Sequence, residues 1–146
     1  MTDRLAFLRT VAPFDLLPPE VLEQVAALLQ EVMHPREAVI YRQGETELRG
    51  VDLIIEGGYD TFFFDGHLPE FYGPGTCYGG VSVLLTKKRS LHTVQARAGT
   101  RVYFLHRNDF RRLALSYTPF LQHFNNRYDQ LMRDDKYAEL VQPGPC

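Results

Sequence analysis

The sequence predicts a mainly β fold, an antiparallel double-stranded β-helix or jelly roll, with helices before and after it. Three observations indicate this class. Short β-prone runs alternate with glycine-containing turns over about residues 33–105. Apolar residues recur at helical spacing over about residues 4–30, and again over about residues 108–140. We therefore expect a single domain over residues 1–140, followed by a linker-like tail at residues 141–146.

The N-terminal segment predicts two helices. Pro18-Pro19-Glu20 places proline at a helix start and an acidic residue in the first turn, where the helix dipole favours it. Apolar side chains then follow at helical spacing, at Val21, Leu22, Val25, Leu28 and Leu29. We expect a shorter helix over residues 4–10, with Phe14 between the two helices and placed to pack as a staple.

The middle of the chain predicts the roll. Several of its β-prone runs end in turns such as Gly57-Gly58 and Asp65-Gly66, which favour antiparallel connections. The runs are residues 39–41, 51–55, 61–64, 70–72, 93–96 and 101–105. Between them, the segment from Gly79 to Leu85 predicts a single helical turn rather than another strand.

The C-terminal segment predicts two more helices. Asn108 or Asp109 is a candidate cap for a helix that ends near Ser116. Pro119 can open a second helix, from Phe120 to about Leu140. One face of this helix is apolar, with Phe120, Phe124, Tyr128 and Leu131. That face is expected to cover either the roll or a twofold partner, so a homodimer through this helix is one prediction.

Composition places the chain among globular proteins. It has 146 residues, of which 45% are hydrophobic and 23% are charged. Apolar runs such as Val83-Leu84-Leu85 are too short to span a membrane, and the N-terminus lacks the apolar segment of a signal peptide. We therefore expect a cytoplasmic protein without a membrane partner. The two cysteines, Cys77 and Cys146, make neither a disulfide framework nor a metal cluster.

Charge is distributed unevenly along the chain. The net charge of −2 argues against a general nucleic-acid binder. Residues 86–112 nevertheless carry eight basic side chains and one acidic one, whereas residues 1–85 carry five basic and thirteen acidic ones. This basic block indicates either an anion-binding site or a set of solvated strand and helix faces.

Catalytic and DNA-binding motifs are missing from the sequence. The five histidines are scattered, without the spacing of a metal site, so a metal-dependent enzyme built on such a roll is not expected. We find no nucleophile–histidine–carboxylate set with local support, no P-loop and no dinucleotide fingerprint. A helix-turn-helix does not fit in the residues after the last helix, so no DNA partner is expected. The sequence predicts a non-enzyme without a cofactor.

The order of elements and several motifs resemble the cyclic nucleotide-binding domain family over about residues 7–134. The resemblance rests on the order and spacing of these segments: Pro13-Phe14-Asp15-Leu16-Leu17, Ala38-Val39-Ile40-Tyr41-Arg42-Gln43-Gly44-Glu45, Leu53-Ile54-Ile55-Glu56-Gly57-Gly58, Gly73-Pro74-Gly75-Thr76-Cys77-Tyr78-Gly79 and Thr93-Val94-Gln95-Ala96. The segment from Tyr78 to Thr86 resembles a divergent branch, in which the domain precedes paired CBS domains and a nucleotidyltransferase domain. The resemblance implies that the chain is the N-terminal sensor part of a larger protein of this kind.

The resemblance also implies a ligand site. In the family, backbone amides of a short helix hold the cyclic phosphate, a glutamate binds the ribose 2′-hydroxyl and an arginine pairs with the phosphate. Here Gly80 stands at the glutamate position and Ser90 at the arginine position, with Arg89 one residue earlier. The implied ligand-binding residues are Tyr78, Gly79, Gly80, Val81, Ser82, Lys88, Arg89, Ser90, His92 and Thr93.

Gly80 at the glutamate position, Ser90 at the arginine position and the basic block at residues 86–112 lead to the following expectations. An anion should bind near the amides of residues 80–83, with Lys88 or Arg89 within reach. Cyclic AMP should bind weakly or not at all, and Gly80→Glu should tighten its binding. The implied function is regulatory nucleotide sensing in signal transduction, with a cyclic nucleotide or another nucleotide as ligand. The alternative is a ligand-free structural or dimerisation module of a larger CBS-type signalling protein.

Overall fold

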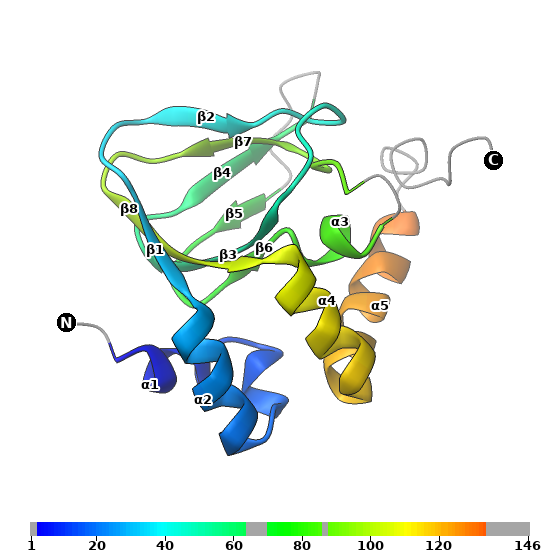
Figure 1. Ribbon diagram of the computed structural model, residues 1–146. Coiled ribbons are helices and arrows are strands. Elements are labelled where there is room, and N and C mark those ends of the chain that lie inside the picture. Colours follow the sequence, from blue (N-terminus) through cyan, green and yellow to red (C-terminus); the bar gives the residue numbers. More distant parts are fainter. Residues whose placement is uncertain (1–2, 64–69, 86–87, 134–146) are drawn as a thin grey trace.

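Two antiparallel sheets form a roll whose lower end is covered by helices (Figure 1). The structure, a computed structural model, describes residues 3–63, 70–85 and 88–133. One sheet has the strand order β1-β8-β3-β6 and the other has the order β2-β7-β4-β5. The strands are β1 (Gln30–His34), β2 (Ala38–Tyr41), β3 (Gly50–Glu56), β4 (Tyr59–Phe62), β5 (Glu70–Tyr72), β6 (Cys77–Tyr78), β7 (Thr93–Ala96) and β8 (Thr100–His106). The predicted jelly roll with flanking helices is confirmed.

The first sheet shows where sequence periodicity misplaced a boundary. Helical spacing predicted helix up to about residue 30, but α2 (Pro19–Leu28) ends earlier and β1 begins at Gln30. The reason is tertiary: Gln30 pairs with Phe104 of β8, and the register continues to His34 opposite Thr100. The two-residue strand β6 was also not predicted, and it pairs with the middle of β3. Strand pairing of this kind overrides local propensity.

The second sheet follows the predicted runs closely. Strands β5 and β7 have the predicted bounds, whereas β4 begins at Tyr59, two residues earlier than the predicted run. The reason is the register with β7, in which Tyr59 lies opposite Ala96. The predicted turn at Asp65-Gly66 lies outside the described residues.

Two short elements precede α2 at the N-terminus. They are α1 (Arg4–Leu8) and the 3-10 turn η1 (Phe14–Leu16). The carboxylate of Asp3 caps α1 by accepting a hydrogen bond from the amide of Leu5 at 3.0 Å. Phe14 is fully buried, and its ring packs edge-on against Phe120 at 5.1 Å between centroids. It therefore joins the N-terminal segment to the C-terminal helices.

The remaining helices are α3 (Gly80–Leu84), α4 (Arg107–Ser116) and α5 (Thr118–Met132). The single helical turn predicted after Gly79 is α3. Helix α4 is capped by His106 rather than by Asn108 or Asp109, because the Nδ1 of His106 accepts a hydrogen bond from the amide of Asn108. The predicted extension of the last helix to Leu140 and the tail at residues 141–146 lie outside the described residues.

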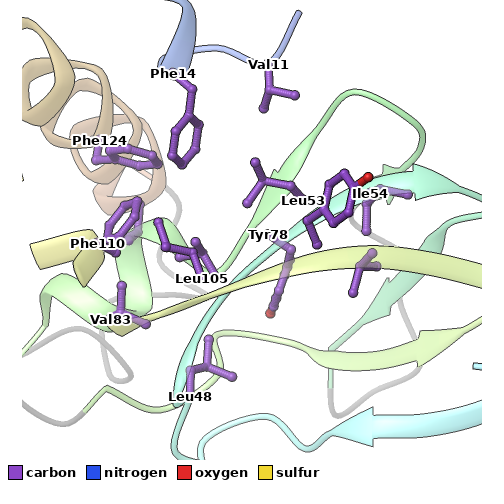
Figure 2. Close-up of a cluster of buried hydrophobic side chains, with 14 of the residues drawn as sticks. Val11, Phe14, Leu48, Leu53, Ile54, Tyr78, Val83, Leu105, Phe110 and Phe124 are labelled. Atoms are coloured by element: carbon purple, nitrogen blue, oxygen red, sulfur yellow. The ribbon is translucent and has the colours of Figure 1, made fainter. Parts of the chain in front are cut away.

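An aromatic cluster fixes α5 beside α3 and α4. Figure 2 shows Phe14, Phe110 and Phe124 gathered at this helix, apart from the residues inside the roll such as Leu53 and Ile54. Ring centroids of Phe110 and Phe124 lie 5.0 Å apart, and those of Phe120 and Phe124 lie 5.4 Å apart. Phe120, Phe124 and Leu131 of α5 are all buried within this one chain. Of the two expected roles for this face, the structure shows contact with the chain's own residues, and the homodimer stays a prediction.

Candidate functional site

A cavity of about 310 Å³ lies between the roll and α5. Its volume is at the lower end of the range of small-molecule sites, roughly 300–1,000 Å³. The turn before β6, the start of α3 and the middle of α5 supply most of its wall. The lining residues are Ala12, Glu70, Tyr72, Gly75, Thr76, Cys77, Tyr78, Gly79, Gly80, Val81, Ser82, Leu91, His92, His123, Phe124, Arg127 and Leu131.

Two adjacent glycines form the floor of the cavity for different reasons. Gly79 precedes α3 with a φ of 101°, in the left-handed region that favours glycine. Gly80 has no such conformation, but it lies against α5. A Cβ at Gly80 would lie 2.1 Å from Cε1 of Phe124. Glycine at this position therefore lets the ring of Phe124 reach the start of α3.

A buried polar network joins two residues of the cavity wall, Tyr78 and His92, to Ser90. The hydroxyl of Tyr78 lies 2.8 Å from Oγ of Ser90 and 3.3 Å from Nδ1 of His92. The hydroxyl of Ser90 donates to the carbonyl of His92 at 2.6 Å. Burial, and to a lesser extent the positive charge of Arg127, lower the pKa of His92 to about 4. His92 is therefore neutral near pH 7 and offers a polar ring rather than a cation.

A buried carboxyl group, which sequence reasoning did not single out, lies deeper in the roll. Asp52 on β3 accepts hydrogen bonds from the hydroxyls of Tyr41 and Tyr59, the latter at 3.0 Å. Burial raises the pKa of Asp52 to about 6, although both hydroxyl donors lower it. The ring of Tyr41 stacks on that of Tyr78 at 5.9 Å, so this group adjoins the cavity network. No sequence signal identified Asp52, because it sits within an ordinary β-prone run.

An ion pair closes one side of the cavity. Nη2 of Arg127 on α5 lies 2.6 Å from Oε2 of Glu70 on β5. Burial raises the pKa of the Tyr72 hydroxyl, and the charge of Glu70 adds to that effect while Arg127 opposes it. Among the described residues that line the cavity, Arg127 is the only lysine or arginine. The sequence indicated only a charged residue on this helix and did not place it at the site.

The structure brings six of the predicted site residues to the cavity. They are Tyr78, Gly79, Gly80, Val81, Ser82 and His92. Lys88, Arg89, Ser90 and Thr93 do not line it. The segment before β7 is held against residues 46–48: the carbonyl of Lys88 accepts from the amide of Leu48 at 2.7 Å, and Arg89 forms a β-bridge with Glu47.

Neither Lys88 nor Arg89, the basic residues expected near the phosphate, thus lines the cavity. Nη1 of Arg89 donates to the carbonyl of Gly44 at 3.4 Å, and Ser90 contributes to the buried polar network. The hydroxyl of Thr93 accepts from the amide of Gln43 at 3.1 Å. Residues that sequence reasoning did not assign to the site, notably Glu70, Tyr72 and Arg127, take part in the wall instead.

Metal ligation, a membrane-spanning helix and a reactive thiol find little support in the described part of the chain. Within residues 3–63, 70–85 and 88–133, no cluster of three or more potential metal ligands occurs. None of the helices described there is long and apolar enough to cross a membrane. Burial raises the pKa of the Cys77 thiol, and Asp52 adds to that effect, which disfavours the nucleophilic thiolate.

Comparisons with known proteins agree with the sequence resemblance. The family model described as cyclic nucleotide-binding domain matches residues 31–117. A cAMP-dependent protein kinase regulatory subunit of Eremothecium gossypii is 32% identical over 88 residues, which are 60% of this chain and 19% of the relative. The chain thus matches about a fifth of that relative's length.

Solved structures share the fold. The sensor domain of the transcriptional regulator DNR from Pseudomonas aeruginosa matches with a TM-score of 0.74 at 15% identity, over 97% of this chain and 99% of that one. The regulatory domain of Toxoplasma gondii PKA, crystallised with cAMP, matches with a TM-score of 0.66 at 21% identity, over 75% of this chain and 42% of that one. At these identities the likeness shows a common fold.

Proposed function

The chain belongs to the cyclic nucleotide-binding domain family, and on that basis we propose that it is a regulatory nucleotide-sensing domain whose phosphate-binding cassette is divergent. The observation that carries this proposal is the cavity enclosed by Tyr78–Ser82 on one side and α5 on the other. A ligand in this cavity touches both the roll and a helix, so its binding can change how the helix sits. That coupling is what a sensing domain requires.

The cavity wall offers chemistry suited to a nucleotide. Tyr72, His92 and Phe124 line the cavity, and their aromatic rings are groups on which a base can stack. The hydroxyls of Thr76 and Ser82 are polar groups at the same wall, and Arg127 carries the positive charge. A small apolar cavity with a few polar groups is the usual form of a small-molecule site.

Gly80 sets an expectation for affinity. A glycine cannot supply the carboxylate that binds the ribose hydroxyl in the family pattern. Hydrogen bonds to charged groups contribute about 1.5–3 kcal/mol. We therefore propose that cyclic AMP binds roughly 10- to 150-fold more weakly than in a domain with that glutamate, other contacts being equal. The preferred ligand then need not be cyclic AMP.

A thermal-shift and calorimetric screen with cyclic AMP, cyclic GMP, AMP, ADP and ATP tests the function. A ligand at 100 times its dissociation constant adds about 2.7 kcal/mol to the stability of the folded state. His123→Trp places a larger ring at the cavity wall and should weaken binding of any ligand found. Gln122→Trp, at the exposed neighbouring position outside the cavity, should not. If both variants bind the ligand with equal affinity, the binding site is not this cavity.

The second candidate is a ligand-free structural or dimerisation module, including the CBS-linked arrangement that the resemblance implies. The contact between Phe124 and Gly80 favours it, because α5 is seated on the roll by the chain's own side chains. This candidate predicts no stabilisation by any nucleotide of the screen. Light scattering at high concentration then tests for a dimer, and a monomer would remove the dimerisation version.

A further inference from the structure

The ion pair between Arg127 and Glu70 joins two elements that meet at the cavity. Arg127 lies on the C-terminal half of α5, and Glu70 begins the edge strand β5. Their side chains are 33% and 42% exposed, so solvent and a ligand can both reach the pair. Exposed pairs of this kind are weak. A competing anion can therefore separate them.

The charge of Arg127 also acts inside the cavity. It lowers the pKa of His92, which also lines the cavity. It opposes the effect of Glu70 on the pKa of Tyr72, which lies between the pair and Tyr78. The guanidinium is thus close enough to these groups to meet a ligand that touches them.

Four other arginines form ion pairs away from the cavity in the described part of the chain. Arg97 pairs with Asp60, Arg101 with Glu31 and Glu56, Arg107 with Glu47, and Arg112 with Asp109. None of these side chains lines the cavity, and neither does Arg89. An anionic ligand taken out of water needs a counter-charge. In the described part of the wall, Arg127 is the arginine that can provide it.

The position of Arg127 is independent of the family pattern. The family model ends at residue 117, so α5 contributes a group that the model does not cover. Ser90 stands where the resemblance places an arginine, and its hydroxyl is already bonded to Tyr78 and His92. Among the described residues, the cation that lines this cavity therefore comes from α5 rather than from the roll.

We propose that Arg127 is the phosphate-binding group of the nucleotide site, and that Glu70 competes with the phosphate for it, so that ligand binding releases the C-terminal half of α5 from β5. This inference rests on the proposed nucleotide-sensing function. A guanidinium can hold phosphate oxygens through two parallel hydrogen bonds, whereas Glu70 accepts one from Nη2 of Arg127 at 2.6 Å. The aromatic contacts of Phe120 and Phe124 hold the N-terminal half of α5 meanwhile.

Calorimetric titration with cyclic AMP and with adenosine, which lacks the phosphate, tests the role of Arg127. Arg127→Gln should weaken cyclic AMP binding roughly tenfold or more, the worth of a hydrogen bond to a charged group, and leave adenosine binding unchanged. Arg133→Gln removes an equal charge at an exposed site outside the cavity and should change neither. If Arg127→Gln keeps the wild-type ratio of affinities for cyclic AMP and adenosine, this inference is wrong. The proposed function would then still stand.

The competition by Glu70 needs its own measurement. Glu70→Gln should tighten cyclic AMP binding about twofold to fivefold, the worth of an exposed ion pair, without changing adenosine binding. In the Arg127→Gln background the same change should have no effect. An equal gain in both backgrounds would show simple repulsion by Glu70 and overturn the competition. Absence of nucleotide binding by both the wild type and Glu70→Gln would overturn the proposed function and this inference together.

Hydrogen exchange provides a readout that does not depend on affinity. Without ligand, Glu70→Gln and Arg127→Gln should each speed exchange of the amides of residues 125–133, because both break the same contact. Binding of cyclic AMP to the wild type should also speed exchange of the amides of residues 125–133, while the amides near Phe120 stay protected. If exchange is unchanged in both variants and circular dichroism shows that they are folded, the ion pair between Arg127 and Glu70 does not hold α5 against β5.

Discussion

The ring of Phe124 occupies the space that a side chain at Gly80 would need. A Cβ at Gly80 would lie 2.1 Å from Cε1 and 2.6 Å from Cδ1 of that ring. This contact changes the outcome expected for Gly80→Glu. The conformational condition is met, since Gly80 is not among the glycines with positive φ. The space is missing while α5 is seated, so the glutamate has to displace α5 before it can meet a ribose.

The first prediction tests the contact through Gly80→Ala. Alanine in a helix normally stabilises by up to about 1 kcal/mol relative to glycine. Here the collision with Phe124 should outweigh that gain, because overpacking costs about 1–3 kcal/mol. Urea unfolding should therefore show a loss of stability for Gly80→Ala. In a Phe124→Ala background, or Phe124→Leu if the alanine variant does not fold, the same change should be neutral or stabilising. Loss of equal size in both backgrounds would contradict the contact.

The second prediction concerns the left-handed residue before α3. Gly79→Ala and Gly75→Ala both force alanine into a positive φ, 101° at Gly79 and 86° at Gly75, which costs about 1–2 kcal/mol. A Cβ at Gly79 also lies 3.0 Å from Cδ1 of Leu48, whereas one at Gly75 meets nothing within 4 Å. Chemical unfolding should show the larger loss for Gly79→Ala. If the two variants lose the same free energy of unfolding, the side chain of Leu48 makes room for the new methyl group without destabilising the fold.

The third prediction concerns the seat of α5. Phe120 is fully buried among Phe14, Phe110 and Phe124, so Phe120→Ala should lower the free energy of unfolding by about 3–5 kcal/mol. Leu115, on α4, is 80% exposed, and Leu115→Ala should change the free energy of unfolding by less than about 0.5 kcal/mol. Guanidinium unfolding of both variants makes the comparison. Small losses in both would mean that α5 is loosely attached.

The fourth prediction is a pH dependence set by two buried groups of opposite sign. Burial raises the pKa of Asp52 from 3.8 to about 6, so its contribution to stability is present below pH 4 and is lost as the pH rises towards 6. Burial lowers the pKa of His92 from 6.5 to about 4, so its contribution is present above pH 6.5 and is lost as the pH falls towards 4. Between these values the two groups offset each other.

Asp52→Asn separates the two effects. The amide does not titrate, so the variant keeps the dependence of His92 and should lose stability on acidification from pH 6.5 to 4 more steeply than the wild type. The difference in slope can reach about 1.4 kcal/mol per pH unit for one proton. Urea unfolding at several pH values in this window makes the measurement. Parallel profiles for the two proteins would mean that Asp52 titrates in the folded state much as it does in the unfolded chain.

Local sequence patterns were enough to predict the class of fold and the order of its elements. The alternating β-prone runs with glycine turns became the roll, and α3 falls where Gly79-Gly80 predicted a helical turn. These features are local: strand alternation, turn residues and helix starts depend on neighbours in the chain. The same local patterns also indicated Tyr78–Ser82 as part of the site, and these residues line the cavity.

Which charged and buried groups meet at the cavity depends on the packing of elements that lie far apart in the sequence. Arg89 and Lys88 are close to α3 in sequence, yet pairing with residues 46–48 holds their segment away from the cavity. Arg127 and Glu70 are 57 residues apart, and they meet because Phe120 and Phe124 seat α5 across the roll. Such contacts depend on how elements pack in space, which the spacing of residues along one chain does not encode.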